Sequence, residues 1–379
     1  NAMVMPFKDF RIDLTLTKTF SKSHSELYAD TGSGVFNHFN PYETGAFNIS
    51  YVSVKTMFKN TSVGSPVYDE FLTNRLVASR RLGVSNPYTN GLRDPANPNY
   101  YKGYGPFSQD VLIPSFIAAY SGKGIEDQAL IDHNNKSIKD NPFKYFIPLP
   151  NWKVTYTGLT KIPFFANRMN NFILNHTYTG SMSMNGFNSS LLFNDLFGLG
   201  FSSFIDPNSN NYVPFYQVPN VTISQAFNPL IGLEGGFKNN VTGRFEVRKS
   251  KMQSLSLIDY QVSENLSTEY VIGFGFRKKG IILPFPIFGV RKLKNELITK
   301  VDLGLRDDKS SNTFLANNIN VVSRGQKVIR ISPTIDYIAN KNLTLRFFFD
   351  RTQTIPYVSN SYPTTNTRAG VTLRFIFGQ

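Results

Sequence analysis

The C-terminal stretch Thr367-Arg-Ala-Gly-Val-Thr-Leu-Arg-Phe-Ile-Phe-Gly-Gln379 alternates apolar with polar or small residues. Successive side chains of an extended chain point to opposite faces. One face therefore carries only apolar side chains: Ala369, Val371, Leu373, Phe375 and Phe377. A strand in a soluble protein usually ends after about five or six residues, whereas a transmembrane strand needs about 9–11. The length of the alternation predicts a membrane-spanning β-strand.

The same alternation recurs upstream, so the pattern in the C-terminal stretch is not a coincidence. Each recurrence has one apolar face and one face that carries charged residues or glycine. The segments are Val241–Arg248, Tyr270–Arg277, Leu297–Arg306, Ile329–Tyr337 and Leu343–Asp350. Together they predict an all-β fold, namely a transmembrane antiparallel β-barrel segment that forms part of a very large barrel, with long loops and one or two short helical inserts.

The charged face of these strands is predicted to line a wet lumen. An Arg or Lys placed against lipid at the bilayer midplane costs about 2–4 kcal/mol, and a one-residue slip would place the whole charged set there. The predicted lumen-facing residues are Arg244, Glu246, Arg248, Lys300, Asp302, Arg330, Asp336, Arg346, Asp350 and Arg374. The predicted lipid-facing residues are Phe274, Phe276, Val301, Leu303, Ile329, Ile331, Leu345, Phe347, Leu373 and Phe375.

The connections between the predicted strands differ in length. Asn239-Asn240 and Ala339–Asn342 have tight-turn chemistry, because Asn tolerates a positive φ. We expect them at the periplasmic end, together with the C-terminus. Val262–Leu266, Asp307–Gln326 and Thr354–Asn366 are predicted as looser extracellular loops. Lys279–Lys294 fits poorly as an apolar periplasmic link, and folding into the lumen is its alternative.

The composition agrees with a barrel that has a lipid face. Of 379 residues, 17% are charged, fewer than the roughly 25% typical of soluble domains, and 14% are aromatic. No apolar run approaches the length of a transmembrane helix. Cysteine is absent, which excludes disulfides and thiolate metal sites.

The net charge of +14 has two interpretations. It favours an anionic partner, or it reflects strands and loops that simply carry many Arg and Lys residues. The basic residues are spread along the strands and no nucleic-acid motif accompanies them, so no nucleic-acid partner is predicted.

Along the chain, four parts are predicted. Residues 1–61 hold barrel strands at Phe10–Thr17 and Gly45–Phe58, separated by a loop at Ser21–Tyr42. Residues 62–150 form an insert with helices near Pro66–Gly83 and Val111–Tyr120, which fills the lumen, caps it from outside or merely shields it. Residues 151–227 hold strands with a long loop at Asp195–Pro219 and a hairpin turn at Asn185-Gly186. Residues 228–379 form a C-terminal barrel meander.

No catalytic, cofactor-binding or metal site is predicted. The four histidines, His24, His38, His133 and His176, lie far apart with no metal-ligand spacing. Asp206 begins a stretch similar to a calcium loop, but Asn211 and Gln217 replace its Gly and Glu. The glycines of Gly273–Arg277 lie within a predicted strand, so they form no phosphate loop. The N-terminus has no signal peptide, and we interpret the chain as a fragment.

Several blocks resemble a known family. They are Asp110–Gly122, Pro148–Leu159, Phe227–Gly232, Lys238–Asn240, Arg248–Ser250 and Glu269–Arg277. These blocks resemble the C-terminal part of the SprA (Sov) family, the outer-membrane translocons of the type IX secretion system of Bacteroidetes. The likeness extends from about Pro6 to Gln379. It implies that the chain is the closing end of a very large barrel in the bacterial outer membrane.

What the family does is also implied by this resemblance. The chain would be the C-terminal barrel segment of a protein-conducting translocon that passes folded cargo proteins to the cell surface. Its partners would be the remaining strands of the same barrel, a PorV-type shuttle barrel, a plug protein, secreted cargo with a C-terminal sorting domain, and outer-membrane lipid. The residues themselves leave two alternatives: an outer-membrane porin or receptor-type barrel for small solutes, and a membrane-bound esterase that uses His176.

Overall fold

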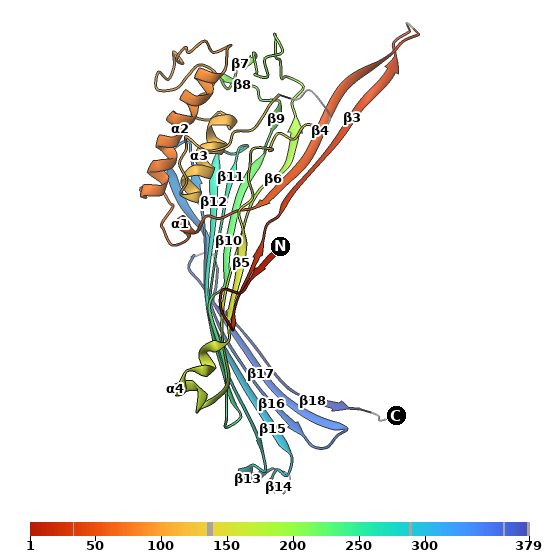
Figure 1. Cartoon of the computed structure of the whole chain (residues 1–379), viewed down its shortest axis with the longest axis vertical. Helices are drawn as coiled ribbons and strands as arrows, with labels where there is room; N and C mark the ends of the chain where they lie inside the picture. Colours follow the sequence, from red (N-terminus) through yellow and green to blue (C-terminus); the bar gives the residue numbers. More distant parts are fainter. Residues whose placement is uncertain (33, 135–138, 288–289, 359–360, 377–379) are drawn as a thin grey trace.

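One antiparallel sheet dominates the computed structural model, which describes residues 1–32, 34–134, 139–287, 290–358 and 361–376 (Figure 1). The prediction of an all-β fold with short helical inserts is therefore confirmed. Phe377 and Gln379 of the C-terminal stretch lie outside the described residues.

The strands of the main sheet follow one another as a meander. Their order is β1 (Ala2–Val4), β2 (Phe10–Thr15), β5 (Asn151–Tyr156), β6 (Met169–Ser189), β10 (Asn220–Phe237), β11 (Val241–Ser256), β12 (Gln261–Lys279), β15 (Glu296–Phe314), β16 (Ile319–Ile338), β17 (Leu343–Pro356) and β18 (Thr364–Phe375). Among the described residues, β1 pairs only with β2 and β18 only with β17. The sheet of this chain is therefore open at two edges.

The helical insert divides what would otherwise be one continuous strand of the sheet into two strands. β3 (Lys18–Asp30) continues the direction of β2 and pairs with β4 (Phe36–Ser50) in a hairpin that projects beyond the sheet (Figure 1). β4 pairs with the upper part of β6, where Ser50 lies opposite Ser181. β5 pairs with β6 just below, where Trp152 lies opposite Tyr178. The chain thus leaves the sheet after Ser50, earlier than the expected boundary at residue 61, and returns at Asn151.

The insert contains α1 (Val54–Met57), α2 (Pro66–Ser85) and α3 (Gln109–Ser121). The Ser65 side chain accepts a hydrogen bond from the backbone N of Tyr68, and Pro66 occupies the first turn of α2. α3 ends at Gly122, whose φ of 68° is in the left-handed region. Both helices lie where the sequence predicts them. They pack on the sheet through a shared core that includes Phe71, Phe116, Phe47, Ile223 and Leu255.

Short elements complete the fold. They are the 3-10 helix η1 (Gly158–Lys161), α4 (Pro163–Ala166), β7 (Ile205–Asp206), β8 (Asn211–Tyr212), β9 (Tyr216–Gln217), β13 (Ile282–Ile287) and β14 (Val290–Lys292). The link after β12, expected as an apolar periplasmic link or a segment folded into the lumen, contains the β13–β14 pair. None of the described helices has the length and apolar character needed to cross a membrane.

Four predicted loops or turns are wrong. Ser21–Tyr42 belongs to β3 and β4, Val262–Leu266 to β12, and most of Asp307–Gln326 to β15 and β16, which leaves only residues 315–318 as a turn. Asn185-Gly186 is a bulge inside β6: Asn185 lies opposite Ala46, Phe187 opposite Gly45, and Gly186 has a φ of 71°. In the first three places both faces of the strand carry polar residues, so hydrophobic alternation is weak although the backbone ladder continues. At Asn185-Gly186 the bulge shifts the alternation by one residue, from Met184 to Phe187, and both of these side chains are buried.

Candidate functional site: a two-faced sheet and its insert

All ten residues predicted to be lumen-facing lie on one face of the sheet. The cross-strand register decides this, because directly opposite residues share a face. Arg244 lies opposite Gly273, Gly273 opposite Asp302, and Asp302 opposite Ser332. The same register places Asp336 opposite Arg346. We refer to this surface as the charged face.

Ion pairs bridge neighbouring strands on the charged face. Arg248 of β11 contacts Glu246 at 2.6 Å and Glu269 of β12 at 3.1 Å. Arg346 of β17 donates two hydrogen bonds to Asp336 of β16, at 2.6 and 2.9 Å. Each such pair is solvent-exposed and contributes about 0.2–1 kcal/mol.

Asp350 of β17 lies at the centre of a three-strand group. Its carboxylate contacts Arg330 of β16 at 3.3 Å and Arg368 of β18 at 2.8 Å. Three other predicted residues of this face, Lys300, Asp302 and Arg374, make no ion pair within the described part of the chain. The charged face thus combines paired side chains, which hold the strands in register, with charges that remain available to solvent or to a passing molecule.

The ten residues predicted to be lipid-facing lie together on the opposite face. Many of these large side chains are exposed, including Phe274 (54%), Phe347 (45%) and Leu373 (67%). The band continues onto β2 and β5, where Leu14 lies opposite Trp152 and Ile12 opposite Val154. A continuous exposed apolar surface of this extent is rare on a soluble monomer and marks contact with a partner or a membrane. We refer to it as the apolar band.

The apolar band has a defined upper border. On β15 it extends from Leu297 to Leu305, and the next residue on that face is Asp307. Charged residues occupy the same row on two other strands: Lys249 of β11 and Lys327 of β16. Nine strand residues rise about 30 Å, or about 21–25 Å along the normal at a tilt of 35–45°, close to the band of about 25 Å on outer-membrane barrels.

The helical insert packs on the face that carries the apolar band, above its upper border (Figure 1). Leu255 and Val262, which face the insert, lie opposite each other and continue the row of Phe245 and Ile272 along β11 and β12. The insert therefore occupies the same side of the sheet as the apolar residues, and the charged face lies on the other side.

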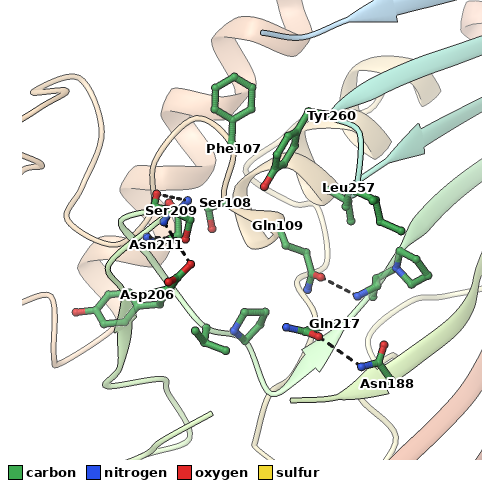
Figure 2. A pocket seen from close by; sticks show the side chains of 16 residues that line it. Phe107, Ser108, Gln109, Asn188, Asp206, Ser209, Asn211, Gln217, Leu257 and Tyr260 are labelled. Atoms are coloured by element: carbon green, nitrogen blue, oxygen red, sulfur yellow. Dashed lines mark hydrogen bonds between the residues drawn. The ribbon is translucent and has the colours of Figure 1, made fainter. Parts of the chain in front are cut away.

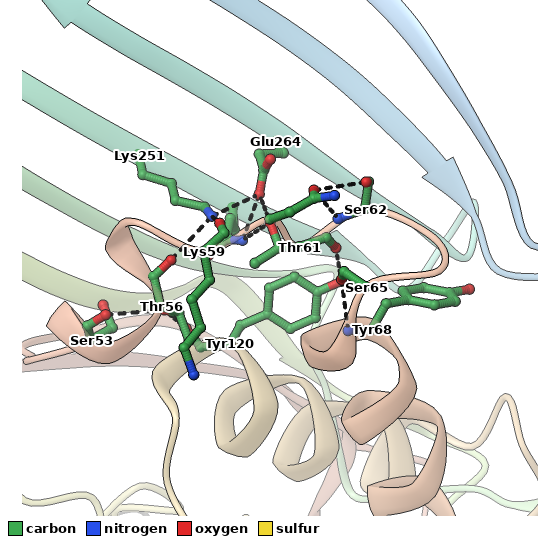
Figure 3. Close-up of polar contacts among 12 residues, drawn as sticks. Ser53, Thr56, Lys59, Thr61, Ser62, Ser65, Tyr68, Tyr120, Lys251 and Glu264 are labelled. Atoms are coloured by element: carbon green, nitrogen blue, oxygen red, sulfur yellow. Dashed lines mark hydrogen bonds and ion pairs between the residues drawn. The ribbon is translucent and has the colours of Figure 1, made fainter.

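A buried polar cluster attaches the insert to the sheet (Figure 3). The Lys251 ammonium donates to the carbonyl of Lys59 at 2.9 Å and to that of Thr56 at 3.3 Å, just after and within α1. It also contacts Glu264 at 3.4 Å, and its side chain is only 1% exposed. Thr61 donates to Glu264 as well. Because the buried lysine needs all three acceptors, this cluster fixes the position of the insert on the sheet.

A second buried polar cluster joins the β3–β4 hairpin to the loop before β10. Lys22 contacts Glu43 at 3.1 Å, and both side chains are almost fully buried. The Tyr216 hydroxyl donates to the same carboxylate at 2.8 Å. Sequence reasoning missed these residues because it assigned Ser21–Tyr42 to a loop, and no local pattern links Lys22 to Tyr216.

A cleft of about 390 Å³ lies between the insert and the upper strand ends (Figure 2). The Gln109 side chain donates to the carbonyl of Tyr216 at 2.8 Å and accepts from the backbone N of Val218 at 2.7 Å. Asp206 accepts hydrogen bonds from the backbone of Asn208 and Ser209, so its carboxylate closes a turn. The polar groups of this cleft mainly bind one another, which makes it a structural junction.

Two of the four histidines come together in the fold, and the other two lie apart from them. The Nδ1 of His176 donates a hydrogen bond to the carbonyl of Leu230 at 2.6 Å on the face of the apolar band, and His133 contacts Asp110 at 2.9 Å. His24 contacts Glu26 and Glu43, and His38 contacts Glu26. Within the described ranges, no group of three or more His, Asp or Glu side chains is arranged to hold a metal ion.

Comparison of the chain with protein-family models gives no match. Comparison with curated proteins gives no match either. The functional interpretation therefore depends on the geometry of the sheet and on the residues described above.

Proposed function

We propose that this chain is a wall segment of an outer-membrane protein-conducting translocon of the SprA (Sov) type, which passes folded cargo proteins to the cell surface. In this proposal the apolar band contacts lipid and the charged face lines the conduit. The chain makes and breaks no covalent bond. Its contribution is a stiff, charged wall along which a folded protein moves without binding tightly.

The observation that carries the membrane part of this proposal is the bounded apolar band. It continues across neighbouring strands, it has the height of a hydrocarbon core, and it ends at a row that includes Lys249, Asp307 and Lys327. With the band in the membrane, the insert lies outside the wall beyond the outer leaflet, as an extracellular cap. This location differs from the lumen-filling alternative.

The observation that favours a large conduit is the pair of open edges. A strand with unpaired backbone groups at a sheet edge requires a partner inside a membrane. We infer that β1 and β18 pair with further strands of the same barrel. A shuttle barrel of the PorV type, a plug protein and secreted cargo with a C-terminal sorting domain remain proposed partners on the strength of the family resemblance alone.

The alternative is a porin or receptor-type barrel that closes within this chain and admits small solutes. It requires β1 to pair with β18, and the described residues of these strands pair elsewhere. A photo-crosslinking amino acid at Met3 or Val371 of the intact protein distinguishes the two. The translocon proposal expects cross-links to polypeptide outside residues 1–379; a β1–β18 cross-link would support the closed pore.

Transport experiments test the activity itself. Intact protein reconstituted in planar bilayers and in liposomes is expected to admit a folded cargo protein once the conduit is opened. A protein that conducts sugars but excludes every folded cargo would overturn the proposal. The esterase alternative requires a nucleophile hydrogen-bonded to His176, and none is present among the described residues. Unchanged lipid hydrolysis by membranes that contain the His176→Ala variant would exclude the esterase alternative.

A further inference from the structure

A hollow interrupts the lower part of the apolar band. Its volume is about 580 Å³, and its lining residues include Phe172, Leu233, Phe245 and Phe274. Gly235 of β10 lies opposite Gly243 of β11, which in turn lies opposite Phe274 of β12. Glycine replaces a large side chain at both positions, and at Gly243 the missing side chain lowers the surface of the band and leaves the hollow.

The hollow is open above Gly243. A Cβ atom added there would have Phe237 Cε2 as its nearest neighbour, at 3.9 Å. At Gly235, by contrast, a Cβ atom would lie 2.2 Å from Met169 Cε, so the chain itself already fills that position. A larger residue at position 243 would therefore occupy the hollow without colliding with the backbone.

The short helix α4 forms one side of the hollow. Phe165 packs on Phe172 of β6, with ring centroids 4.9 Å apart, and Phe164 contacts Phe165 edge to face at 5.2 Å. Phe164 nevertheless remains 62% exposed. Aromatic side chains at the end of an apolar band are typical of the level where lipid headgroups begin.

One cationic residue, Arg168, lines the hollow, and a second, Lys238, is next to it in the chain's β10–β11 turn. The backbone N of Lys238 donates to the carbonyl of Arg168 at 2.9 Å, which holds the two residues together. The Arg168 guanidinium lies 4.6 Å from the centroid of Phe164 and donates one hydrogen bond to the Phe164 carbonyl. Neither side chain pairs with an acidic group within the described part of the chain, so both are available to an anion.

We propose that this hollow binds one acyl chain of an anionic glycerophospholipid, whose phosphate contacts Arg168 and Lys238. The inference rests on the proposed function, since it requires the apolar band to lie in a bilayer. The flexible acyl chain matches an apolar hollow that is open along the strands. A guanidinium offers paired N–H donors that suit a phosphate, and the lysine adds a second positive charge.

Native mass spectrometry of the intact protein tests this proposal. The protein is released from nanodiscs that contain equal amounts of phosphatidylglycerol and phosphatidylcholine with identical acyl chains. We expect one phosphatidylglycerol to be retained at least about fivefold over phosphatidylcholine. Gly243→Leu is expected to lower retention of both lipids by a similar factor, because the leucine fills the hollow. The double variant Arg168→Glu, Lys238→Glu is expected to abolish the preference while leaving phosphatidylcholine retention unchanged.

Two control variants match these changes. Ile335→Phe adds bulk to the apolar band several strands away, and Lys102→Glu reverses an exposed charge on the insert; both are expected to leave lipid retention unchanged. Equal retention by the wild type and Gly243→Leu would overturn the acyl site, and equal retention of the two lipids by the wild type would overturn the phosphate contact.

Alkaline extraction of membranes separates failure of the lipid site from failure of the proposed function. Every variant is first required to remain in the membrane pellet. If the wild type itself is extracted as a peripheral protein, both the membrane wall and the lipid site are refuted. If the wild type and variants remain integral while lipid retention does not respond to Gly243→Leu, only the lipid site is refuted.

Discussion

Ser50 lies opposite Ser181, and Trp152 lies opposite Tyr178. Ser181 and Tyr178 are only three positions apart on β6, although the whole helical insert separates Ser50 from Trp152 in the chain. The two connections between the insert and the sheet therefore lie next to each other, beside the same part of β6. Such an arrangement allows a large domain to be added without disturbing the ladder on either side. The attachment then depends on the contacts at that point and on the buried cluster around Lys251.

The first prediction concerns Gly180, which lies at this junction. The backbone N of Tyr51 donates to its carbonyl at 2.9 Å, and its own N donates to the Asn151 side chain at 2.7 Å. A Cβ atom at position 180 would lie 2.2 Å from the Tyr51 carbonyl oxygen, which belongs to the backbone. We expect Gly180→Val to destabilise the protein by about 1–3 kcal/mol.

The measurement for Gly180→Val is the temperature at which the folded barrel band is lost in electrophoresis without boiling. Gly304→Ala is the matched control, because a Cβ atom there would meet only Arg330 Cβ at 3.7 Å. Equal loss of thermal stability in the two variants would show that the junction imposes no special constraint at Gly180.

The second prediction concerns the buried Lys251. Its replacement by Met leaves Glu264 without its cation and removes the Lys251 donor from the Lys59 carbonyl. The Thr56 carbonyl loses the same donor but keeps the backbone N of Lys59 at 3.1 Å. Removal of one partner of a buried pair typically costs 3–5 kcal/mol. Because the cluster joins the insert to the sheet, we expect Lys251→Met to release the insert and expose the Asn86–Phe107 loop to protease.

Limited proteolysis with sequencing of the cleavage site checks this prediction. Lys309→Met serves as the control, because that side chain is 60% exposed and makes only a 3.9 Å contact with Asp307. A double-mutant cycle with Glu264→Gln measures the coupling directly. Additive effects of Lys251→Met and Glu264→Gln would contradict a specific attachment.

The third prediction distinguishes the two faces of the sheet. The natural chain has no cysteine, so single cysteines can be introduced at chosen positions without removing others. We expect Leu303, Leu345 and Leu373 variants to resist a membrane-impermeant maleimide and their spin labels to report lipid. Variants at Lys300, Arg346 and Arg374, each close to one of these along its strand, are expected to react and to report water.

This comparison is sharp because paired positions share a strand and differ only in face. Leu303→Arg adds a test of cost: a cation in the middle of the band is expected to destabilise the protein by about 2–4 kcal/mol. The same change at Val322, which lies opposite Ser311 on the same face above the border, is expected to cost far less. A reversed labelling pattern would exclude a lipid-facing apolar band.

The strands near the C-terminus could be predicted from sequence because a sheet with one apolar and one charged face requires strict alternation. From Leu297 to Leu305 every second residue lies on the face of the apolar band, and the charged residues between them fix the register. The same rule fails where a strand rises above the band. β3 and the upper half of β12 carry polar residues on both faces, so their sequences resemble loops although backbone pairing continues.

The insert could be predicted only in part. Pro66 and the 3.6-residue periodicity indicated α2, but nothing local predicts that Ser50 and Asn151 belong to one strand position. The buried polar residues were also missed, since Lys251 and Lys22 are indistinguishable in sequence from surface lysines. Their partners, at Thr56, Lys59 and Glu43, are brought to them by tertiary packing.

The last prediction concerns Lys123, at the end of α3 in the insert. Burial, with a smaller effect of nearby Lys55, lowers the pKa of its ammonium from 10.5 to about 8. The Tyr51 ring, 3.9 Å away, favours the protonated form and limits this shift. The lowered pKa means that the folded state disfavours the charged amine.

The sign of the pH effect follows from this shift. Below about pH 8 the Lys123 amine is protonated in both the folded and the unfolded chain. The folded chain then bears the full free-energy cost of keeping the charged amine partly buried. Between about pH 8 and 10.5 the folded chain loses the proton first, so its free energy of unfolding rises with pH. We expect a gain of about 1–2 kcal/mol, less than the full shift implies because the amine is only half-buried.

Amine acylation followed by mass spectrometry at several pH values measures the titration. Lys123 is expected to reach half-maximal reactivity near pH 8, below the ordinary lysine value of 10.5. Lys55→Gln is expected to move the Lys123 midpoint upward, because one positive charge is removed. Lys123→Met is expected to abolish the rise in stability between pH 8 and 10.5. A Lys123 midpoint near 10.5 would show that the amine is solvated, and hence that it does not lie over the Tyr51 ring as described.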